Sequence, residues 1–289
     1  MTPRHIASTD GVTLAVHDLG GHDQSGHGRE ILYSHATGFH GRVWTPFADH
    51  LSDRYHGWAI DYRGHGDSTS APDGVIAWSD YGDDCTAVLD ALALVPPLFG
   101  VGHSKGGVSL LMSERARPGT FAALALYEPV VFPPDFERNG DGPSMLIEGA
   151  RRRRAEFGSY EAAIENFSSK PPLNALAPAA LDAYVRYGFA LTAEGTVRLK
   201  CEPEHEARTY EGGPAHRAWD WLDEIWCPVL IMSGDPRAIG PGPMAPQVAA
   251  RLPHGRHQGF AHLSHFGPLQ DPEGVAGAVA RYFAEISGA

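Results

Sequence analysis

The sequence predicts an α/β protein with a doubly wound, mostly parallel sheet and an inserted, mainly helical cap. Short apolar runs typical of strands alternate with segments of helical periodicity up to residue 132. The alternation stops between residues 133 and 226, where helical patterns mix with turns, and then resumes. At 289 residues, the chain is long enough for one large domain with such an insertion.

The elements before the break follow from their patterns in chain order. Strands are expected in VTLAVHDLG (12–20), EILYSHA (30–36), WAIDY (58–62), LFGVGHS (98–104) and FAALALYEPVVF (121–132). Helices are expected between them in RVWTPFADHLSD (42–53), WSDYGDDCTAVLDALAL (78–94) and GGVSLLMSERAR (106–117). Because strand and helix alternate, the strands are expected to be parallel and to carry functional loops at their carboxyl ends.

The remaining elements are expected within the cap and after it. The cap has helical patterns in YEAAIENF (160–167) and AALDAYVRYGFAL (179–191) and a β-like TVRLKCEPE (196–204). The core resumes with strands in CPVLIMSGD (227–235) and GRHQGFA (255–261), and with helices in APQVAARLP (245–253) and after the N-cap Asp271. The predicted organisation is a core of residues 1–132 and 227–289 and a cap of residues 133–226.

Composition excludes several classes of partner. Asp and Glu number 35 against 23 Lys and Arg, and a net charge of −12 repels nucleic acid and anionic membranes, so neither partner is expected. The run Arg151–Arg154 is interpreted as a solvated helix face. No apolar stretch resembles a signal peptide or approaches the about 18 residues of a spanning helix. Cys85, Cys201 and Cys227 are too scattered for a disulfide framework or a metal site, so a cytoplasmic location is expected.

No metal or cofactor is expected. His17, His22 and His27 lie near one another in the sequence, but GGHDQSGHGRE (20–30) has the glycine, aspartate and serine content of a loop. The expected partner is a small-molecule substrate, and the expected state is a monomer or a homodimer.

The stretch FGVGHSKGG (99–107) places Ser104 between glycines where a predicted strand meets a predicted helix. A hydroxyl at such a junction projects into a cleft only if the backbone turns sharply, and Cβ atoms two residues away on either side would collide. Gly102 and Gly106 lack those atoms. The pattern Gly-x-Ser-x-Gly in this context predicts that Ser104 is a nucleophile.

This motif and three others resemble the α/β-hydrolase family over nearly the whole chain. SHATGFHGRVW (34–44) stands where the family has its oxyanion loop, and DYRGHGDS (61–68) matches its D-x-R-G-x-G-x-S turn. GHSKGG (102–107) matches its nucleophile turn, and HLSHFGPLQDPE (262–273) matches its C-terminal histidine segment. The cap carries no motif that can be compared.

His265 is predicted to be the base that activates Ser104, because a serine hydroxyl is a poor nucleophile at neutral pH. It lies in the loop after the last predicted strand, six residues before Asp271, where the resemblance places the family's histidine. His262 and His257 are nearby alternatives, and for each an ordinary loop histidine is the simpler interpretation.

The carboxylate that orients this imidazole has two candidates. The resemblance places it three residues past the glycine of VLIMSGD, but that position is Arg237. Asp235, one residue past the same glycine, is preferred and requires a rearranged loop. Glu128, in LYEP at the end of the strand before the cap, is the alternative. An ion pair with Lys105 is its non-catalytic interpretation.

Two backbone N–H groups are expected to stabilise the negative charge that acyl transfer places on the substrate oxygen. Lys105, which follows the nucleophile, supplies one. The other belongs to Thr37 if His35-Ala36 replaces the family's His-Gly, or to Phe39 if the following glycine does.

The leading hypothesis is a serine hydrolase that cleaves a small carboxylic ester or similar acyl compound through an acyl-enzyme on Ser104. A C–C bond hydrolase or a cofactor-free haloperoxidase would share the same triad, and a non-catalytic ligand-binding protein is a further alternative. Dehalogenase and epoxide hydrolase functions are disfavoured because those relatives have aspartate in place of Ser104.

Other residues are expected to support the site. Arg63 and His65 are expected to brace the active-site loops. The cap aromatics are interpreted mainly as the cap's own core, with an acyl pocket as the alternative; they are Phe132, Phe136, Phe157, Phe167, Tyr184, Tyr187 and Phe189.

Overall fold

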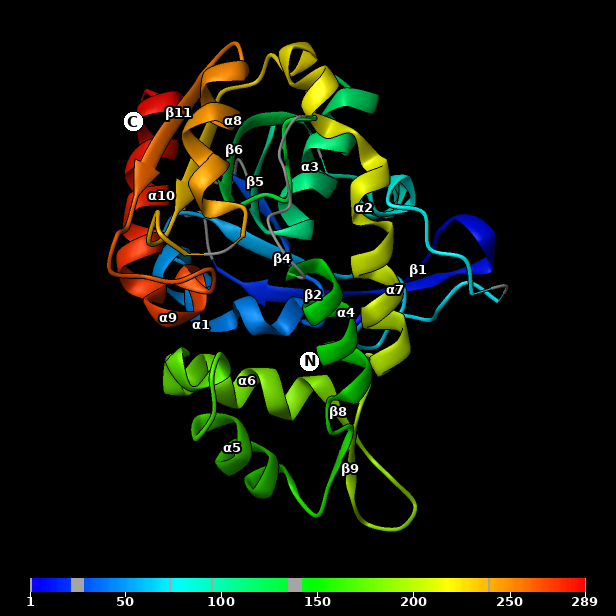
Figure 1. Cartoon of the computed structure of the whole chain (residues 1–289). Helices are drawn as coiled ribbons and strands as arrows, with labels where there is room; N and C mark the ends of the chain where they lie inside the picture. The colour runs from blue at the N-terminus through cyan, green and yellow to red at the C-terminus, as the bar shows by residue number, and fades with distance from the viewer. Residues whose placement is uncertain are drawn as a thin grey trace.

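The computed structural model describes residues 2–21, 29–72, 74–94, 96–134, 142–238 and 240–288. Within them, an eight-stranded sheet has the order β1-β2-β4-β3-β5-β6-β10-β11 (Figure 1). Its strands are β1 (Arg4–Ala7), β2 (Thr13–Gly20), β3 (Glu30–Ser34), β4 (His56–Asp61), β5 (Leu98–His103), β6 (Phe121–Tyr127), β10 (Val229–Ser233) and β11 (Gly255–Gly259).

The sheet is mostly parallel, as predicted. Strand β2 pairs in antiparallel fashion with both of its neighbours, β1 and β4, whereas the strands from β4 to β11 in the sheet order pair in parallel. The central strand β5 is buried along its whole length, which is why Leu98–His103 reads as a continuous apolar run rather than an alternating one. The carboxyl ends of β5, β6 and β10 therefore meet at one edge of the sheet.

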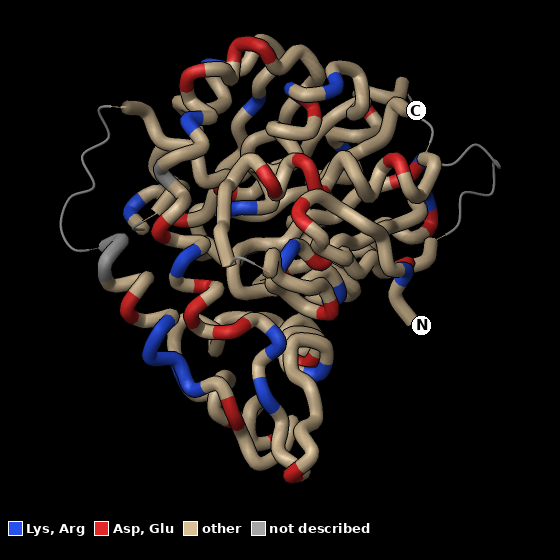
Figure 2. Tube along the Cα trace, turned by 90° about the vertical axis from the view of Figure 1, so that its right-hand side faces the viewer, with Lys and Arg blue, Asp and Glu red and all other residues tan. Residues whose placement is uncertain are grey.

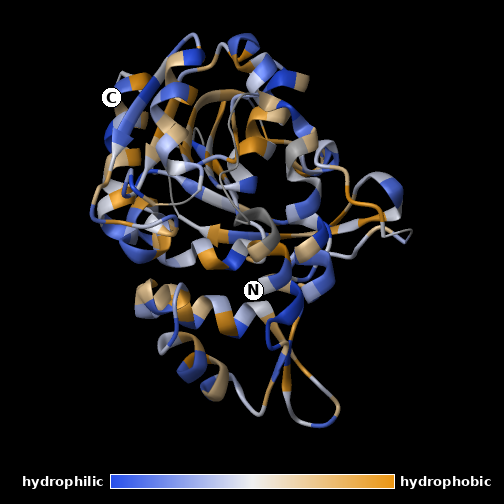
Figure 3. Ribbon diagram, in the orientation of Figure 1, coloured by the Kyte–Doolittle hydropathy of each residue, from blue (hydrophilic) through white to orange (hydrophobic). Residues whose placement is uncertain are grey.

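Helices cover both faces of the sheet. Apolar side chains of α1 (Thr45–Ala48) and α10 (Pro272–Ser287) pack in the core on one face. Those of α2 (Ser79–Leu92), α3 (Lys105–Ala116) and α8 (Ala245–Arg251) pack on the other face. Hydrophobic residues are accordingly concentrated on the central strands, and hydrophilic residues on the outer helix surfaces (Figure 3). Layers on both faces confirm the doubly wound arrangement.

The residues between β6 and β10 form the cap elements, some of which lie below the sheet in Figure 1. Its helices are α4 (Gly142–Arg152), α5 (Tyr160–Ser168), α6 (Pro178–Gly188) and α7 (Pro203–Gly212). A small sheet joins β7 (Glu156–Phe157), β8 (Phe189–Leu191) and β9 (Val197–Leu199) in the order β7-β9-β8. The short helix α9 (Gly267–Gln270) precedes α10. The division of the chain at residues 132 and 226 stays a prediction.

Two predicted helices differ from the structure. The segment 42–53 forms short helical turns around α1 instead of one helix, and Pro46 stands near its middle. The segment 179–191 is helical only to Gly188, because Phe189–Leu191 pairs with β9 as strand β8. The predicted N-cap is confirmed, since the Asp271 carboxylate accepts a hydrogen bond from the Gly274 N–H at 2.9 Å.

Charged residues of both signs are interspersed over the core and the cap (Figure 2). The run Arg151–Arg154 illustrates this, because Arg151 pairs with Glu204 and Glu211, and Arg152 pairs with Glu148. Among the described residues, no helix has both the length and the apolar character needed to cross a membrane.

Candidate active site

Ser104 lies at a strained turn between β5 and α3. Its backbone φ of 55° is unusual for a residue with a side chain. A Cβ at Gly102 would lie 2.7 Å from the Gly107 Cα, and one at Gly106 would lie 2.3 Å from the Ser34 carbonyl oxygen. The predicted need for glycine on both sides of Ser104 is therefore confirmed by the packing.

His265 is paired with Glu128. The His265 Nδ1–H donates to Glu128 Oε2 at 2.6 Å, while Glu128 Oε1 accepts from the Gly234 N–H at 2.8 Å. The Glu128 side chain is 2% exposed and the His265 ring 26% exposed. Both oxygens of a buried carboxylate are thus hydrogen-bonded, and the Nε2 atom of His265 is left to accept a proton.

The loop that carries His265 is held by the two strands beside it. The Nε2–H of His103, the residue before Ser104, donates to the His265 carbonyl at 2.7 Å, and the two rings are 4.8 Å apart. The Tyr127 hydroxyl donates to the Ser264 carbonyl at 2.9 Å. Burial, together with His265, lowers the pKa of His103 well below its ordinary value, so its imidazole is neutral. These contacts bring Ser104 and His265 to the same edge of the sheet.

The preference for Asp235 over Glu128 is wrong as a prediction of which carboxylate contacts the histidine. Asp235 accepts hydrogen bonds from the Arg237 guanidinium at 2.9 and 2.8 Å. These bonds hold the pKa of Asp235 at about 2. Arg237, at the position where the resemblance places the acid, therefore pairs with Asp235. Glu128, at the end of the neighbouring strand β6, bonds to His265 instead.

The alternative histidines do not contact Glu128. The His257 ring lies 3.0 Å from the Ser233 hydroxyl, and His262 is exposed. Both fit the interpretation as ordinary histidines. Of the three candidates, the structure brings only His265 to a buried carboxylate.

The alternative interpretation of Glu128, as an ion-pair partner of Lys105, is also wrong. The Lys105 Nζ lies 4.2 Å from the centre of the Tyr62 ring and 4.1 Å from that of Tyr81. Lys105 therefore points under the helix toward α2, while Glu128 points toward His265. The Lys105 N–H belongs to the first turn of α3, where N–H groups have no partner within the helix, so it remains a candidate oxyanion donor.

The loop after β3 offers the second candidate donor. The Phe39 N–H already donates to the Ala36 carbonyl at 3.2 Å, which favours Thr37 of the two candidates. The His35 Nδ1–H donates to the same carbonyl at 2.7 Å, and His35 Nε2 accepts from the Tyr62 N–H at 3.1 Å. Burial lowers the pKa of His35 well below its ordinary value, so a neutral, fixed imidazole shapes this loop.

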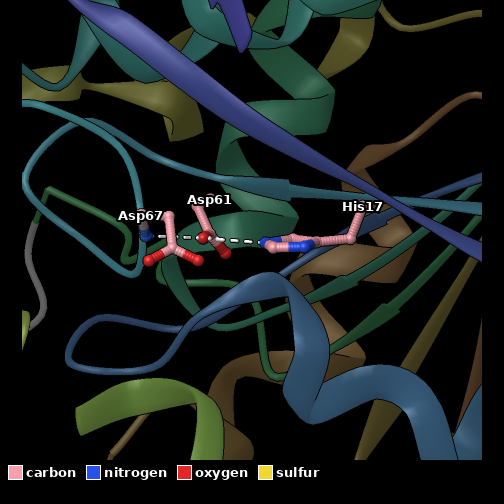
Figure 4. A group of neighbouring side chains, drawn as sticks. All are labelled: His17, Asp61 and Asp67. Carbon is pink, nitrogen blue, oxygen red and sulfur yellow. Dashed lines mark hydrogen bonds and ion pairs between the residues drawn. The ribbon is translucent and has the colours of Figure 1, made fainter. Parts of the chain in front are cut away.

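Asp61, which Figure 4 shows between His17 and Asp67, anchors the far end of the same loop. Its carboxylate accepts from the Gly41 N–H at 2.6 Å, the Asp67 N–H at 2.8 Å and His17 Nε2 at 2.9 Å. Burial alone would raise the pKa of Asp61, but the hydrogen bond and charge of His17 outweigh it and hold the pKa below its ordinary value. Asp61 thus links β2, the β4 turn and the oxyanion loop.

His17, Asp61 and Asp67 are close enough to hold a metal ion in geometric terms. Their ligand atoms already have protein partners, because Asp67 also pairs with Lys200 at 2.6 Å. A lysine ammonium beside the carboxylates would repel a cation, so this donor set fits a structural hub. His22, which was considered with His17, and His27 lie outside the described residues.

Arg63 and His65 fit the bracing role expected of them. The Arg63 guanidinium forms ion pairs with Asp84 at 2.8 Å and with Asp80 at 2.9 Å, both on α2. The His65 Nδ1–H donates to the Arg63 carbonyl at 2.9 Å. The Arg63 guanidinium is thus paired with carboxylates and the His65 Nδ1 with a backbone carbonyl, which fits a bracing role.

The cap aromatics pack mainly on one another. Phe157 lies 5.5 Å from Phe167 and 5.9 Å from Phe189, measured between ring centres, which fits the interpretation as the cap's own core. Tyr184 is different, because its ring lies 5.1 Å from Phe39 of the oxyanion loop. Tyr187 is partly exposed on α6, and Phe136 lies outside the described residues.

Arg153 departs from the expected solvated face. It is 18% exposed and binds Glu206 and the Tyr184 hydroxyl. A Cβ at Gly38 would lie 2.5 Å from Glu206 Oε1, so this cap ion pair rests directly on the oxyanion loop. The cap therefore covers the candidate active site with a buried charge pair.

His103 and Asp61 are the supporting residues that motif reasoning missed. Both stand inside quoted motifs, and the signal for each was a polar residue at the end of a strand otherwise predicted to be buried. A buried polar group must find hydrogen-bond partners, and here the partners are the two loops of the site.

Comparisons with known proteins agree with this geometry. The profile of the "Alpha/beta hydrolase family" matches residues 31–278. A 2-(acetamidomethylene)succinate hydrolase from Mesorhizobium japonicum is 36% identical over 218 residues, which are 73% of this chain and 72% of that protein. A pimeloyl-[acyl-carrier protein] methyl ester esterase from Chromobacterium violaceum is 26% identical over 266 residues, 89% and 95% of the two chains.

A solved structure shares the fold. The crystal structure of E-2-(acetamidomethylene)succinate hydrolase superposes with a TM-score of 0.81 at 21% identity, covering 97% of this chain and 98% of the other. The strained serine, the sheet order and the family match over most of the chain lead to one conclusion. This chain belongs to the alpha/beta hydrolase family.

Proposed function

We propose that this chain is a serine hydrolase that cleaves a small carboxylic ester or related acyl compound through an acyl-enzyme on Ser104. The observation that carries the proposal is the hydrogen bond from His265 Nδ1 to the buried Glu128, beside a serine on a strained turn. An imidazole whose Nδ1–H is held by a carboxylate presents its Nε2 as the general base.

The reaction proceeds in two halves. In the first, the Ser104 hydroxyl attacks the acyl carbon as His265 takes its proton, and Glu128 stabilises the resulting imidazolium. The Lys105 and Thr37 N–H groups stabilise the negative oxygen, and loss of one such donor typically costs about 3 kcal/mol of transition-state stabilisation. His265 then protonates the leaving group. In the second half, water attacks the acyl-enzyme by the same route and frees Ser104.

The substrate class follows from the site and the relatives together. We expect the acyl group to lie against aromatic surface next to the oxyanion loop, where the ring centres of Phe39 and Tyr184 are 5.1 Å apart. One relative is named as a methyl ester esterase and another as a hydrolase of an acetamido compound. We infer an acyl ester as the principal substrate and acyl–nitrogen compounds as the nearest alternative.

The proposal extends to the compartment and partners. Cys85, Cys201 and Cys227 are unpaired and buried, which supports a reducing compartment such as the cytoplasm. The partner proposed is a small-molecule substrate, without nucleic acid or membrane.

Labelling with a fluorophosphonate tests the nucleophile. We expect the wild type to be labelled once and to turn over p-nitrophenyl acetate, and Ser104→Ala to lose the label and at least about 10³-fold in kcat. Ser113→Ala, which removes another buried hydroxyl from α3, is the matched control and should keep both. Labelling of Ser104→Ala at the wild-type rate, or a wild type inert toward probe and esters, would overturn the proposal.

A further inference from the structure

The Lys105 side chain is buried in an unusual way. It is 0% exposed, and no hydrogen-bond partner reaches its Nζ within the described part of the chain. The ammonium instead lies between the faces of Tyr62 and Tyr81, about 4 Å from each ring centre. A buried charge held only by aromatic faces is costly, so its retention next to the nucleophile calls for a reason.

The groups around Lys105 do not neutralise its charge. The carboxylate whose charge acts on Lys105 is that of Asp84 on α2, and this carboxylate is already paired with Arg63. Burial raises the pKa of the Cys85 thiol, on α2, to about 12, and it also raises the pKa of Cys201, contributed by the cap. Both thiols therefore stay protonated.

Three imidazoles also face Lys105, from different elements. They are His35 after β3, His65 in the turn after β4 and His205 on α7. Burial and then the charge of Lys105 lower the pKa of each, to about 4 in His205. Burial likewise raises the pKa of the Tyr62 and Tyr81 hydroxyls, which remain neutral. The ammonium is therefore a buried positive charge without an ion-pair partner of its own among the described residues.

We propose that the Lys105 ammonium stabilises the oxyanion electrostatically, from behind the backbone N–H of the same residue. The proposal rests on the proposed function. The ammonium does not touch substrate; it adds positive potential at the N-terminus of α3, where the helix dipole already favours negative charge. Such fixed charges act strongly in water-excluded sites, and they require no reorganisation during the reaction.

The charge of the Lys105 ammonium depends on pH near neutrality. Burial lowers the pKa of Lys105 to about 7, and the charge of Asp84 offsets only part of this effect. The ammonium is present below that pH and is lost above it, so its contribution to the rate declines as pH rises through about 7.

The test compares the wild type, Lys105→Met and Lys170→Met in p-nitrophenyl acetate hydrolysis from about pH 5.5 to about pH 9. We expect Lys105→Met to lose about 10- to 100-fold in kcat near pH 6 and to lose the alkaline decline, with a small change in KM. Lys170→Met removes the same charge from an exposed site on the cap and should keep the wild-type profile.

The outcomes separate this inference from the proposed function. If turnover requires Ser104 but Lys105→Met keeps the wild-type kcat and profile, the inference is wrong and the hydrolase remains. If turnover persists in Ser104→Ala, the proposed function fails first. Should Lys105→Met not fold, the wild-type profile decides, since a kcat that stays level between about pH 6 and about pH 9 contradicts the proposal.

Discussion

The carboxyl ends of β6 and β10 each present one acidic residue to the same edge of the sheet, and the two residues have different environments. Glu128, after β6, is 2% exposed and bonds to His265 and to the Gly234 N–H. Asp235, after β10, is 30% exposed and bonds to Arg237, two residues further along the chain.

The difference shows that the position of an acid just after β10 does not decide which carboxylate contacts His265. Asp235 pairs with Arg237, which is close in sequence, so this pair needs no packing between distant parts of the chain. An exposed pair of this kind contributes little to stability. The Glu128 carboxylate is buried, and a buried carboxylate without hydrogen-bond partners would strongly destabilise the fold, so Glu128 stays bonded to His265. The longer glutamate side chain spans the gap between the two strands.

Substitution of the two acids tests the comparison with the largest expected effect. Glu128→Gln should lower kcat by about 10³- to 10⁴-fold, because the imidazolium loses its counter-charge and the imidazole loses its fixed tautomer. Asp235→Asn should stay within about two-fold of the wild type. The measurement is steady-state turnover of p-nitrophenyl acetate. A larger loss of kcat in Asp235→Asn than in Glu128→Gln would identify Asp235, after β10, as the catalytic acid.

A smaller substitution probes the space around the Glu128 carboxylate. A Cβ at Gly242 would lie 2.6 Å from Glu128 Oε1, so Gly242→Ala should displace the carboxylate and lower kcat by about 10- to 100-fold. Gly158→Ala is the matched control, since nothing lies within 4 Å of its added Cβ. Equal activity of the two variants would mean that the exact placement of Glu128 matters little.

The other buried charge at this edge predicts a change in stability. Burial lowers the pKa of Lys105 from 10.5 to about 7, so the folded state carries a cost that is complete below about pH 7 and vanishes as pH approaches 10.5. Lys105→Met should therefore raise the free energy of unfolding near pH 6 by about 1–3 kcal/mol, with a smaller gain near pH 9. Urea unfolding at both values measures it, and a gain that grows with pH would contradict the assignment.

The smallest effect is expected at the exposed pair. The pKa of Asp235 is held at about 2, below its ordinary value, so any stabilisation by Arg237 is present above about pH 4 and lost as pH falls toward 2. Arg237→Ala should leave the melting temperature at pH 7 and the activity almost unchanged. Thermal unfolding at neutral and acidic pH checks this, and a large loss at pH 7 would show that the pair is structural.

Much of the fold could be predicted because local patterns and fold agree. The sequence changes from an apolar strand, Leu98–His103, to a helix, Lys105–Ala116, at the glycines that the turn at Ser104 requires. The cap was harder, since Phe189–Leu191 continues a helical pattern but pairs with β9 across a turn. Whether a segment forms a strand depends on the strand with which it pairs, and the periodicity of its own residues carries no information about that strand.

The residues of the site likewise fall into those that the sequence predicts and those that it does not. Ser104 and His265 follow from motif and position, whereas the choice between Glu128 and Asp235 depends on which side chain packing buries. The position of Lys105 under α3 was not predictable either, because the aromatic rings that hold it come from the β4 turn and from α2. Contacts between elements decided each of these cases.

The central claim is that Glu128 holds the Nδ1 proton of His265, and proton NMR observes that hydrogen bond directly. A short bond between imidazole and carboxylate moves this proton far downfield of the amide signals. We predict such a signal in the wild type and in Asp235→Asn, and its absence in Glu128→Gln. A signal that persists in Glu128→Gln and disappears in Asp235→Asn would contradict the claim.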